Sequence, residues 1–395
     1  MPESFIYLDN STTSRPSDYA LSQMMPFLTD KWGLPSAPHQ KGQELFPALK
    51  TYYKMLYSFL GAQEGDQFVL TSSGAEAVNQ AIHSVYRDVT LPTGKNQFIT
   101  SNADEAPALM AMARLEPLGC SAKMVEVNRQ GIVTADALAE TISPRTALVS
   151  LSWANGLTGV IQPTAEIAAL CQQRGIRLHL DATHVLGKLF YELEEVKADY
   201  ISFNGDQLHA PKGTGGLYIK QGVKCSPLIA GGSDQAGLRA GGLNTAALAG
   251  LAIAAQEALD CRDLLCTETA RLRHKLETGI VKAYPRARIA FKGQERIPHC
   301  TTLLFPGIAN EALLFALNRK GIYATIGGGN FQQLGLLLLA CGLEENLAYS
   351  AVSFSLSRYT TEEEIDRAIE WTAECAYGLE KVSKALISEQ EKIQL

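Results

Sequence analysis

The stretch most informative about the fold lies in the middle of the chain and reads Tyr200-Ile-Ser-Phe-Asn-Gly-Asp-Gln-Leu-His-Ala-Pro-Lys-Gly-Thr-Gly-Gly-Leu-Tyr-Ile219. This pattern predicts a strand, an exposed polar turn and a second strand. A proline at 211 and glycines at 213, 215 and 216 introduce the second strand. The polar turn Asn204-Gly-Asp-Gln207 is therefore the first candidate for a functional site, and the rest of the chain is interpreted around it.

The composition is that of an ordinary globular protein with a large core. The chain has 395 residues, 46% hydrophobic and 19% charged, with a net charge of −6. Because no block of like charge occurs, we expect no binding to nucleic acid or to an anionic membrane. The first ten residues lack the basic and apolar regions of a signal peptide, and the apolar run at 334–340 is too short to span a bilayer. We therefore expect a cytoplasmic protein.

The eight cysteines are scattered and form no C-x-x-C pair. Cys261 and Cys266 are five residues apart near an expected helix, a spacing that suits neither a zinc knuckle nor a redox pair. We expect all eight to be buried, reduced thiols, and we predict no metal site.

Short apolar strands alternate with amphipathic helices from residue 147 onward. Residues 147–151 and 176–181 are expected strands, with an expected helix at 164–174 between them. This alternation predicts a mainly parallel sheet, whose ligands gather at the carboxyl ends of the strands. Asn155, Asp181 and the 204–207 turn are the polar sites expected there.

The central stretch resembles the class-V aminotransferases, fold-type I enzymes that use pyridoxal phosphate (PLP), and most of all the cysteine desulfurases of the NifS/IscS type. In that family the turn reads Ser-Gly-His-Lys, then two residues, then Gly-Pro-Lys-Gly, and its first lysine holds PLP as a Schiff base. Here the sequence reads Asn204-Gly-Asp-Gln207, then Leu-His, then Ala-Pro-Lys212-Gly. The position of the Schiff-base lysine is Gln207, whose amide nitrogen is not a nucleophile.

The resemblance extends from Tyr7 to about Ile369 and implies the cofactor-contacting positions. It places the PLP phosphate at a Ser/Gly turn before a helix, where free backbone N–H groups suit an anion, and it places further contacts at strand ends. The positions implied are Ser73, Gly74, Ala75, Asn155, Asp181, His184, Asn204, Asp206, Gln207 and Gly242. Asp181 corresponds to the aspartate that pairs with the pyridine nitrogen, although a carboxylate there could equally cap the following helix.

Several of these positions differ from the family pattern. Ala75 and Gly242 stand where threonines contact the phosphate, the second of them across the family's dimer, and Asp206 replaces a histidine. The positions that carry the chemistry are also replaced. The histidine that stacks on the pyridine is Glu105, the nucleophilic cysteine corresponds best to Asn330, and the arginine that holds the substrate carboxylate is Ser353. The register of the 327–335 loop stays open, but no cysteine lies between residues 300 and 341.

The resemblance implies a PLP-dependent transferase (type I) α/β fold with a mainly parallel seven-stranded sheet. We expect a large domain at residues 15–255 and a smaller α+β domain made of 1–14 plus 256–395. We also expect one helical stretch at about 246–283 that bridges the two. A homodimer is implied, because the family's active sites borrow residues across the interface.

Three hypotheses for function follow. In the first, the chain is a catalytically degenerate desulfurase homologue that acts as a binding or partner subunit, as a homodimer or paired with an active paralogue or a sulfur-transfer partner. In the second, it is an enzyme that retains PLP or another ligand with altered chemistry. In the third, it is a cysteine desulfurase in spite of these replacements. No covalent cofactor is expected, whereas non-covalent PLP remains open, as does a substitute role for Lys212.

Overall fold

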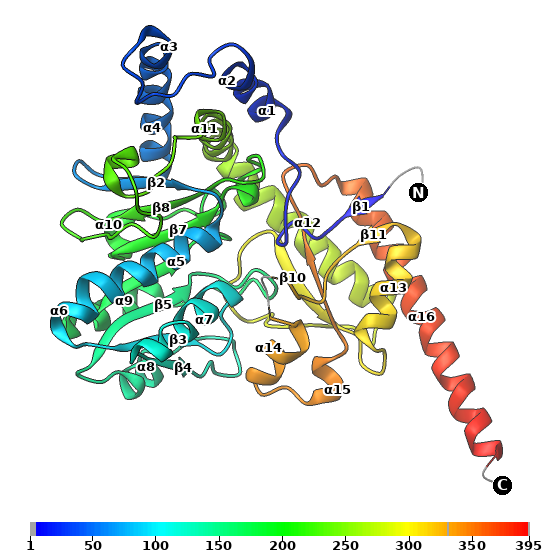
Figure 1. Cartoon of the computed structure of the whole chain (residues 1–395). Helices are drawn as coiled ribbons and strands as arrows, with labels where there is room; N and C mark the ends of the chain where they lie inside the picture. The colour runs from blue at the N-terminus through cyan, green and yellow to red at the C-terminus, as the bar shows by residue number, and fades with distance from the viewer. Residues whose placement is uncertain (1–4, 330–331, 394–395) are drawn as a thin grey trace.

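The computed structural model describes residues 5–329 and 332–393, and it is organised around one large sheet (Figure 1). Its seven strands run in the order β2-β8-β7-β6-β5-β3-β4. Strand β8 is antiparallel to both of its neighbours, and the other pairs are parallel. The strands are β2 (Gln67–Thr71), β3 (Gln97–Ser101), β4 (Ser121–Val125), β5 (Thr146–Ser152), β6 (Arg177–Asp181), β7 (Tyr200–Asn204) and β8 (Gly215–Ile219). The predicted mainly parallel seven-stranded sheet is confirmed.

Helices cover both faces of this sheet because successive strand residues point to opposite sides. In β2, Phe68 and Leu70 belong to the core that also contains residues of α4 and α11, whereas Val69 belongs to the core under α5 and α7. The helices around the sheet are α4 (Phe46–Leu60), α5 (Gly74–Val85), α6 (Leu91–Thr93), α7 (Ala106–Ala113), α8 (Ala135–Thr141), α9 (Thr164–Arg174), α10 (Leu193–Val196) and α11 (Thr245–Asp260).

A second, smaller unit has a core of its own on the right of Figure 1. It contains a three-stranded sheet in the order β12-β10-β9 and a parallel pair of β1 with β11. Its elements are β1 (Ile6–Tyr7), α12 (Arg262–Ala283), β9 (Arg288–Ile289), β10 (Cys300–Leu304), α13 (Asn310–Lys320), β11 (Ile322–Tyr323), β12 (Ala351–Ser355) and α16 (Glu362–Ile393). The intervening helices α14 (Leu334–Ala340) and α15 (Glu345–Ala348) contribute their buried side chains to the core of the large sheet instead. The N-terminal strand thus pairs with a strand some 300 residues away in the C-terminal part.

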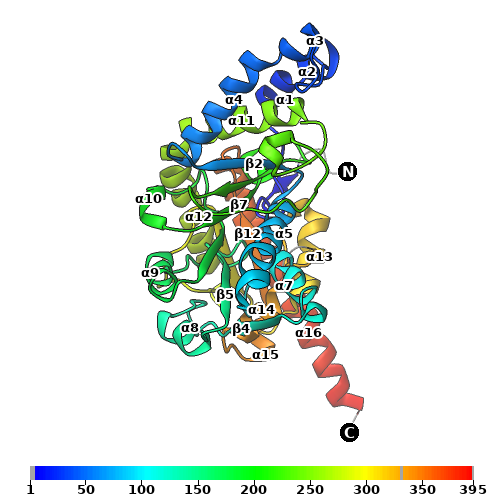
Figure 2. The ribbon, with the colours of Figure 1, turned by 60° about the vertical axis from the view of Figure 1, so that its left-hand side comes forward.

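Three short helices precede α4 and stand out from the body of the molecule in both views (Figures 1 and 2). They are α1 (Asp18–Met24), α2 (Pro26–Thr29) and α3 (Gln40–Gln43). Helix α1 packs on α11, which also packs on α4. This arrangement leaves the outer side of the α1–α4 group exposed.

Two details of the sequence interpretation are wrong. The helical stretch expected at 246–283 is divided at Cys261, where the backbone leaves the helical conformation between α11 and α12. All eight cysteines are free, but only Cys171, Cys300, Cys341 and Cys375 are buried, and the other four are partly exposed. Among the described residues, no helix is long and apolar enough to cross a membrane.

Candidate functional site

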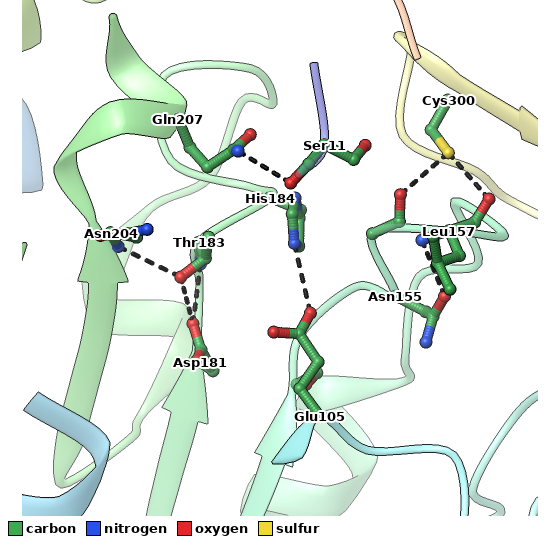
Figure 3. A network of polar contacts seen from close by, with 12 residues as sticks. Ser11, Glu105, Asn155, Leu157, Asp181, Thr183, His184, Asn204, Gln207 and Cys300 are labelled. Carbon is green, nitrogen blue, oxygen red and sulfur yellow. Dashed lines mark hydrogen bonds and ion pairs between the residues drawn. The ribbon is translucent and has the colours of Figure 1, made fainter. Parts of the chain in front are cut away.

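The candidate site lies at the carboxyl ends of β5, β6 and β7, where the N-terminal segment and the smaller unit meet the large sheet (Figure 3). Asp181 ends β6, Asn204 ends β7, and Gln207 lies in the short 3₁₀ turn Gly205–Leu208. Gly205 is required in this turn, because a Cβ there would lie 2.2 Å from the Thr214 hydroxyl oxygen. The structure thus brings together most of the positions predicted from the sequence.

Gln207 is buried and both ends of its carboxamide are hydrogen-bonded. Its Nε2 donates to the carbonyl oxygen of Ser11 at 2.8 Å, and its Oε1 accepts from the Lys188 ammonium at 3.2 Å. Figure 3 shows the Gln207 side chain directed toward Ser11. The position that should hold a reactive amine is therefore a fixed, neutral link between the N-terminal segment and Lys188.

Lys188 was not identified from the sequence. It lies in the turn at 183–188 that follows β6, it is 9% exposed, and burial lowers the pKa of its ammonium to about 8. A lysine inside the otherwise apolar run Val185-Leu-Gly-Lys-Leu-Phe190 is the signal that could have revealed it. At neutral pH this ammonium is mostly charged.

The Asp181 carboxyl at the end of β6 is hydrogen-bonded through one of its two oxygens. Both of its hydrogen bonds go to Oδ1, from the backbone N–H of Thr183 at 3.0 Å and from its hydroxyl at 2.6 Å. Burial and the nearby Glu105 carboxyl raise the pKa of Asp181 to about 7. The carboxyl caps the turn after β6 through Oδ1, and Oδ2 can still accept a proton donor.

Glu105 and His184 contact each other across the site. Glu105 is the N-cap residue of α7, but its carboxyl makes no capping bond and instead lies 3.2 Å from His184 Nε2. Burial raises the pKa of Glu105 to about 8 and lowers that of His184 to about 3. The two groups therefore meet as a neutral acid and a neutral imidazole at pH 7. Gly156 makes room for this, since a Cβ there would lie 2.4 Å from the imidazole.

Three of the backbone N–H groups in and beside the turn before α5 donate to side chains of this chain. Gly74 N–H donates to the Asn204 side chain, Glu76 N–H to the Ser73 hydroxyl, and Ser72 N–H to the Glu76 carboxylate. Ala75 offers no hydroxyl at this turn. The predicted phosphate cradle therefore has fewer open donors than its sequence suggested.

Two further predicted positions, Asn155 and Asp206, also make hydrogen bonds within the chain. Asn155 Oδ1 accepts from the backbone N–H groups of Leu157 and Thr158, and its Nδ2 donates to the Ala103 carbonyl. The Asp206 carboxylate accepts from Thr13 at 2.7 Å and lies 3.4 Å from Lys212.

Three predicted positions remain: the substrate-binding position 353, the dimer-contact position 242 and the nucleophile position 330. Ser353 in β12 donates to the Leu157 carbonyl, beside the buried thiol of Cys300. Gly242 is exposed and approaches Leu34, and Asn330 lies outside the described residues.

These residues fit PLP only in part. Asp181 suits a pyridine nitrogen, but no amine stands at 207, no aromatic or imidazole face at 105, and no guanidinium at 353. Cys300 cannot supply the thiolate, because burial raises the pKa of its thiol to about 11. Among the described residues, no cluster of three His, Cys, Asp or Glu side chains could hold a metal ion.

Comparison with known proteins shows the family directly. Residues 6–368 match the family model "Aminotransferase class-V". The chain is 36% identical to a cysteine desulfurase of Gluconacetobacter diazotrophicus, with 92% of each chain covered. It is 35% identical to the cysteine desulfurase NifS of Azotobacter vinelandii, with 92% of this chain and 90% of that one covered.

Comparison with solved structures also finds NifS-like proteins. A NifS-like protein matches with a TM-score of 0.88 and 29% identity over 95% of this chain and all of the other. A NifS-like protein from Rickettsia africae matches with a TM-score of 0.83 over 94% of this chain and 99% of the other; at 23% identity it supports the fold alone. The chain belongs to the class-V aminotransferase family, among its NifS-like cysteine desulfurases.

Proposed function

We propose that this chain is a catalytically degenerate member of its family that acts as a binding or partner subunit. The observation that carries the proposal is the carboxamide of Gln207, which is buried and hydrogen-bonded at both ends. An amide nitrogen has its lone pair delocalised and cannot attack an aldehyde. Covalent attachment of PLP at the family's position is therefore ruled out chemically.

The other reactive groups support the same proposal. A desulfurase needs a thiolate and a cation for the substrate carboxylate. In the described part of the chain, Ser353 is hydrogen-bonded to a backbone carbonyl, and the nearby Cys300 is held as a thiol. When bound, PLP would supply an electron sink. Here Asp181 can only orient its pyridine nitrogen, so we propose at most non-covalent binding.

One observation favours a second candidate, an enzyme with altered PLP chemistry. Lys188 places a buried amine 3.2 Å from Gln207 Oε1. Lys212 is a weaker substitute, because its side chain is 59% exposed and it pairs with Asp206. If Lys188 captured PLP, the chain would be an enzyme of unidentified chemistry.

Borohydride trapping separates these candidates. Purified protein is incubated with PLP, reduced with borohydride and mapped by mass spectrometry, and sulfide release from cysteine is measured in parallel. We expect no reduced adduct and no sulfide, with any PLP absorbance lost on dialysis. The variant Gln207→Lys is the matched positive control for trapping. A stoichiometric adduct on Lys188 of the unmodified chain supports the second candidate, and sulfide release overturns the first.

For the partner, we propose that a second copy of this chain covers the exposed side of α1–α4. Large apolar side chains are concentrated there, and Trp32 is 67% exposed. The others are Tyr19, Met25, Leu28, Leu34 and Phe46. Apolar patches of this kind rimmed by polar residues are typical of interfaces. Gly242, which the resemblance places at the family's dimer interface, lies beside Leu34.

Light scattering coupled to gel filtration tests this interface. We expect a dimer for the unmodified chain and a monomer for Trp32→Glu, because a buried carboxylate without a partner is costly. Met124→Glu, an equally exposed apolar position on the edge strand β4, is the matched control and should stay dimeric. A monomeric unmodified chain, or a dimer that Trp32→Glu leaves intact, would contradict the proposed interface. If the unmodified chain becomes a stable heterodimer when mixed with an active paralogue, the heterodimer replaces the homodimer.

A further inference from the structure

A small, partly enclosed cavity is lined by Gln207 and Lys188. Its volume is about 20 Å³, and its lining comes from the N-terminal segment, the 187–209 region, α11, α12 and the segments that flank β10 and β12. A cavity of this size holds about one particle the size of a water molecule. It is therefore too small for an amino acid, for a phosphate group or for PLP.

The charged side chains in its wall are cations, and its neutral polar side chains, Asn10, Ser14, Gln207, His209, His299 and Ser357, can both donate and accept hydrogen bonds. Lys188, Arg358 and His299 line the cavity, and its lining includes no carboxylate. Within the described residues, Lys188 Nζ makes one hydrogen bond, to the neutral Gln207 oxygen, so two of its N–H groups remain. Arg358 pairs with Glu257 through its terminal nitrogen, while its buried Nε–H has no partner in the described chain.

His299 is the most informative group in the wall. It is 3% exposed, and neither ring nitrogen has a hydrogen-bond partner within residues 5–329 and 332–393. A buried polar group without a partner costs about 1–3 kcal/mol, so such groups are rare unless a ligand or water satisfies them. Burial holds the pKa of His299 well below its usual range, and the positive charge of Lys188 lowers it further. This imidazole is therefore neutral, with one N–H donor and one acceptor.

The charge of the wall indicates the kind of ligand. Acceptors for a water molecule are present, such as the Gln207 oxygen and one ring nitrogen of His299, so hydrogen bonding alone does not select the ligand. Lys188 and Arg358, however, contribute two positive charges, and the lining contains no carboxylate.

Two carboxylates lie near Lys188 and Arg358 but outside the lining. Asp206 also lies 3.4 Å from Lys212, and Glu257 pairs with Arg358. Burial lowers the pKa of Lys188 even though the Asp206 carboxylate acts to raise it, so an anion beside the ammonium stabilises its charged form.

We propose that the cavity between Lys188, His299 and Arg358 binds one small inorganic monoanion of halide size. The anion accepts from Lys188, from the Arg358 Nε–H and from one ring N–H of His299. It thereby stabilises the ammonium that holds Gln207 in place. This site is separate from the cleft that contains Asp181, and it does not depend on whether that cleft binds PLP.

Bromide is the probe, because its anomalous scattering distinguishes it from water. Crystals of the unmodified chain soaked in sodium bromide should show one anomalous peak in this cavity. Lys188→Met should lose the peak, because the variant keeps the length of the side chain and removes its charge. The exposed Lys212→Met is the matched control and should keep it. Only water in the cavity of the unmodified chain, or a peak that Lys188→Met leaves unchanged, overturns the proposal.

If Lys188→Met fails to fold, chloride NMR on the unmodified chain tests the proposal instead. The width of the chloride line is measured, because binding to the protein broadens it. Excess bromide should remove this broadening, and gluconate, which is too large for the cavity, should leave it unchanged at equal ionic strength. Broadening that gluconate removes equally well would indicate only surface ion pairing and would contradict the proposed site.

Discussion

A lysine introduced at position 207 should lie next to the ammonium of Lys188, and the two positive charges should repel each other. Gln207→Lys puts a second buried amine where Gln207 Oε1 now lies 3.2 Å from Lys188 Nζ. Two ammonium groups about 4 Å apart repel each other by about 4 kcal/mol at an effective dielectric constant near 20. That repulsion corresponds to about three pKa units, shared by the pair.

The sign of the effect on stability follows from proton counting. In the folded variant the repulsion adds to the burial that already lowers the pKa of Lys188 to about 8, so one amine has lost its proton by about pH 7, whereas in the unfolded chain it keeps the proton up to about pH 10. Between these values the unfolded state binds more protons, so the stability of the variant rises with pH relative to the unmodified chain. We expect Gln207→Lys to be about 4 kcal/mol less stable at about pH 7 and nearly equal at about pH 10.

Urea unfolding of both proteins at the two pH values measures this difference. The double variant Lys188→Met, Gln207→Lys is the control, because it has one amine and should lose the pH-dependent penalty. The same penalty for Gln207→Lys at both pH values would refute the reasoning, since the two amines would then not be neighbours in the folded state. The neutral amine that this repulsion creates is also the form that can capture an aldehyde.

Three further results are expected. Glu105→Gln should gain stability relative to the unmodified chain as the pH rises from about 4.5 to about 8, because in that window Glu105 stays protonated in the native chain but ionises in the unfolded chain, which favours unfolding of the unmodified protein; melting temperatures at both ends check this. Cys300 should resist iodoacetamide in the native state and react only after unfolding, because its thiol pKa is raised to about 11; a native adduct found by peptide mapping would contradict this. Arg239→Met should cost about 1–3 kcal/mol in urea unfolding, because it removes the 2.6 Å ion pair with the largely buried Glu76, and a variant as stable as the unmodified chain would show that the pair contributes nothing.

The fold could be predicted because its signals are local and repeated. Alternating residues such as Phe68 and Val69 serve opposite faces of the sheet, and that period of two is visible in the sequence. The end of strand β6 at Asp181 could be placed in the same way. The break at Cys261 could not, because the helix-forming pattern continues through it and packing decides where the chain turns.

The positions of the site could be predicted, but their hydrogen-bond partners could not. Asp206 accepts from Thr13, almost 200 residues earlier in the chain, and Gln207 donates to the Ser11 carbonyl. No local pattern encodes such long-range contacts. Lys188 was missed for a related reason, since a lysine in an apolar run is usually at the surface and only the tertiary structure shows that it is buried.

The residues at two positions that differ from the family pattern make contacts that suit their neighbours in this chain. Gln207 accepts from Lys188 without adding charge, and Glu105 meets His184 as a neutral pair. Restoring one of them therefore creates a conflict with its new neighbour, as the repulsion between a lysine at 207 and Lys188 illustrates. On the proposed function, such a variant gains a covalent link to an aldehyde and nothing more, because Ser353 offers a hydroxyl where the family resemblance implies a guanidinium for the substrate. We therefore expect Gln207→Lys to form the borohydride-stable PLP adduct and release no sulfide from cysteine; sulfide release by this single variant would show that the rest of the site had remained competent.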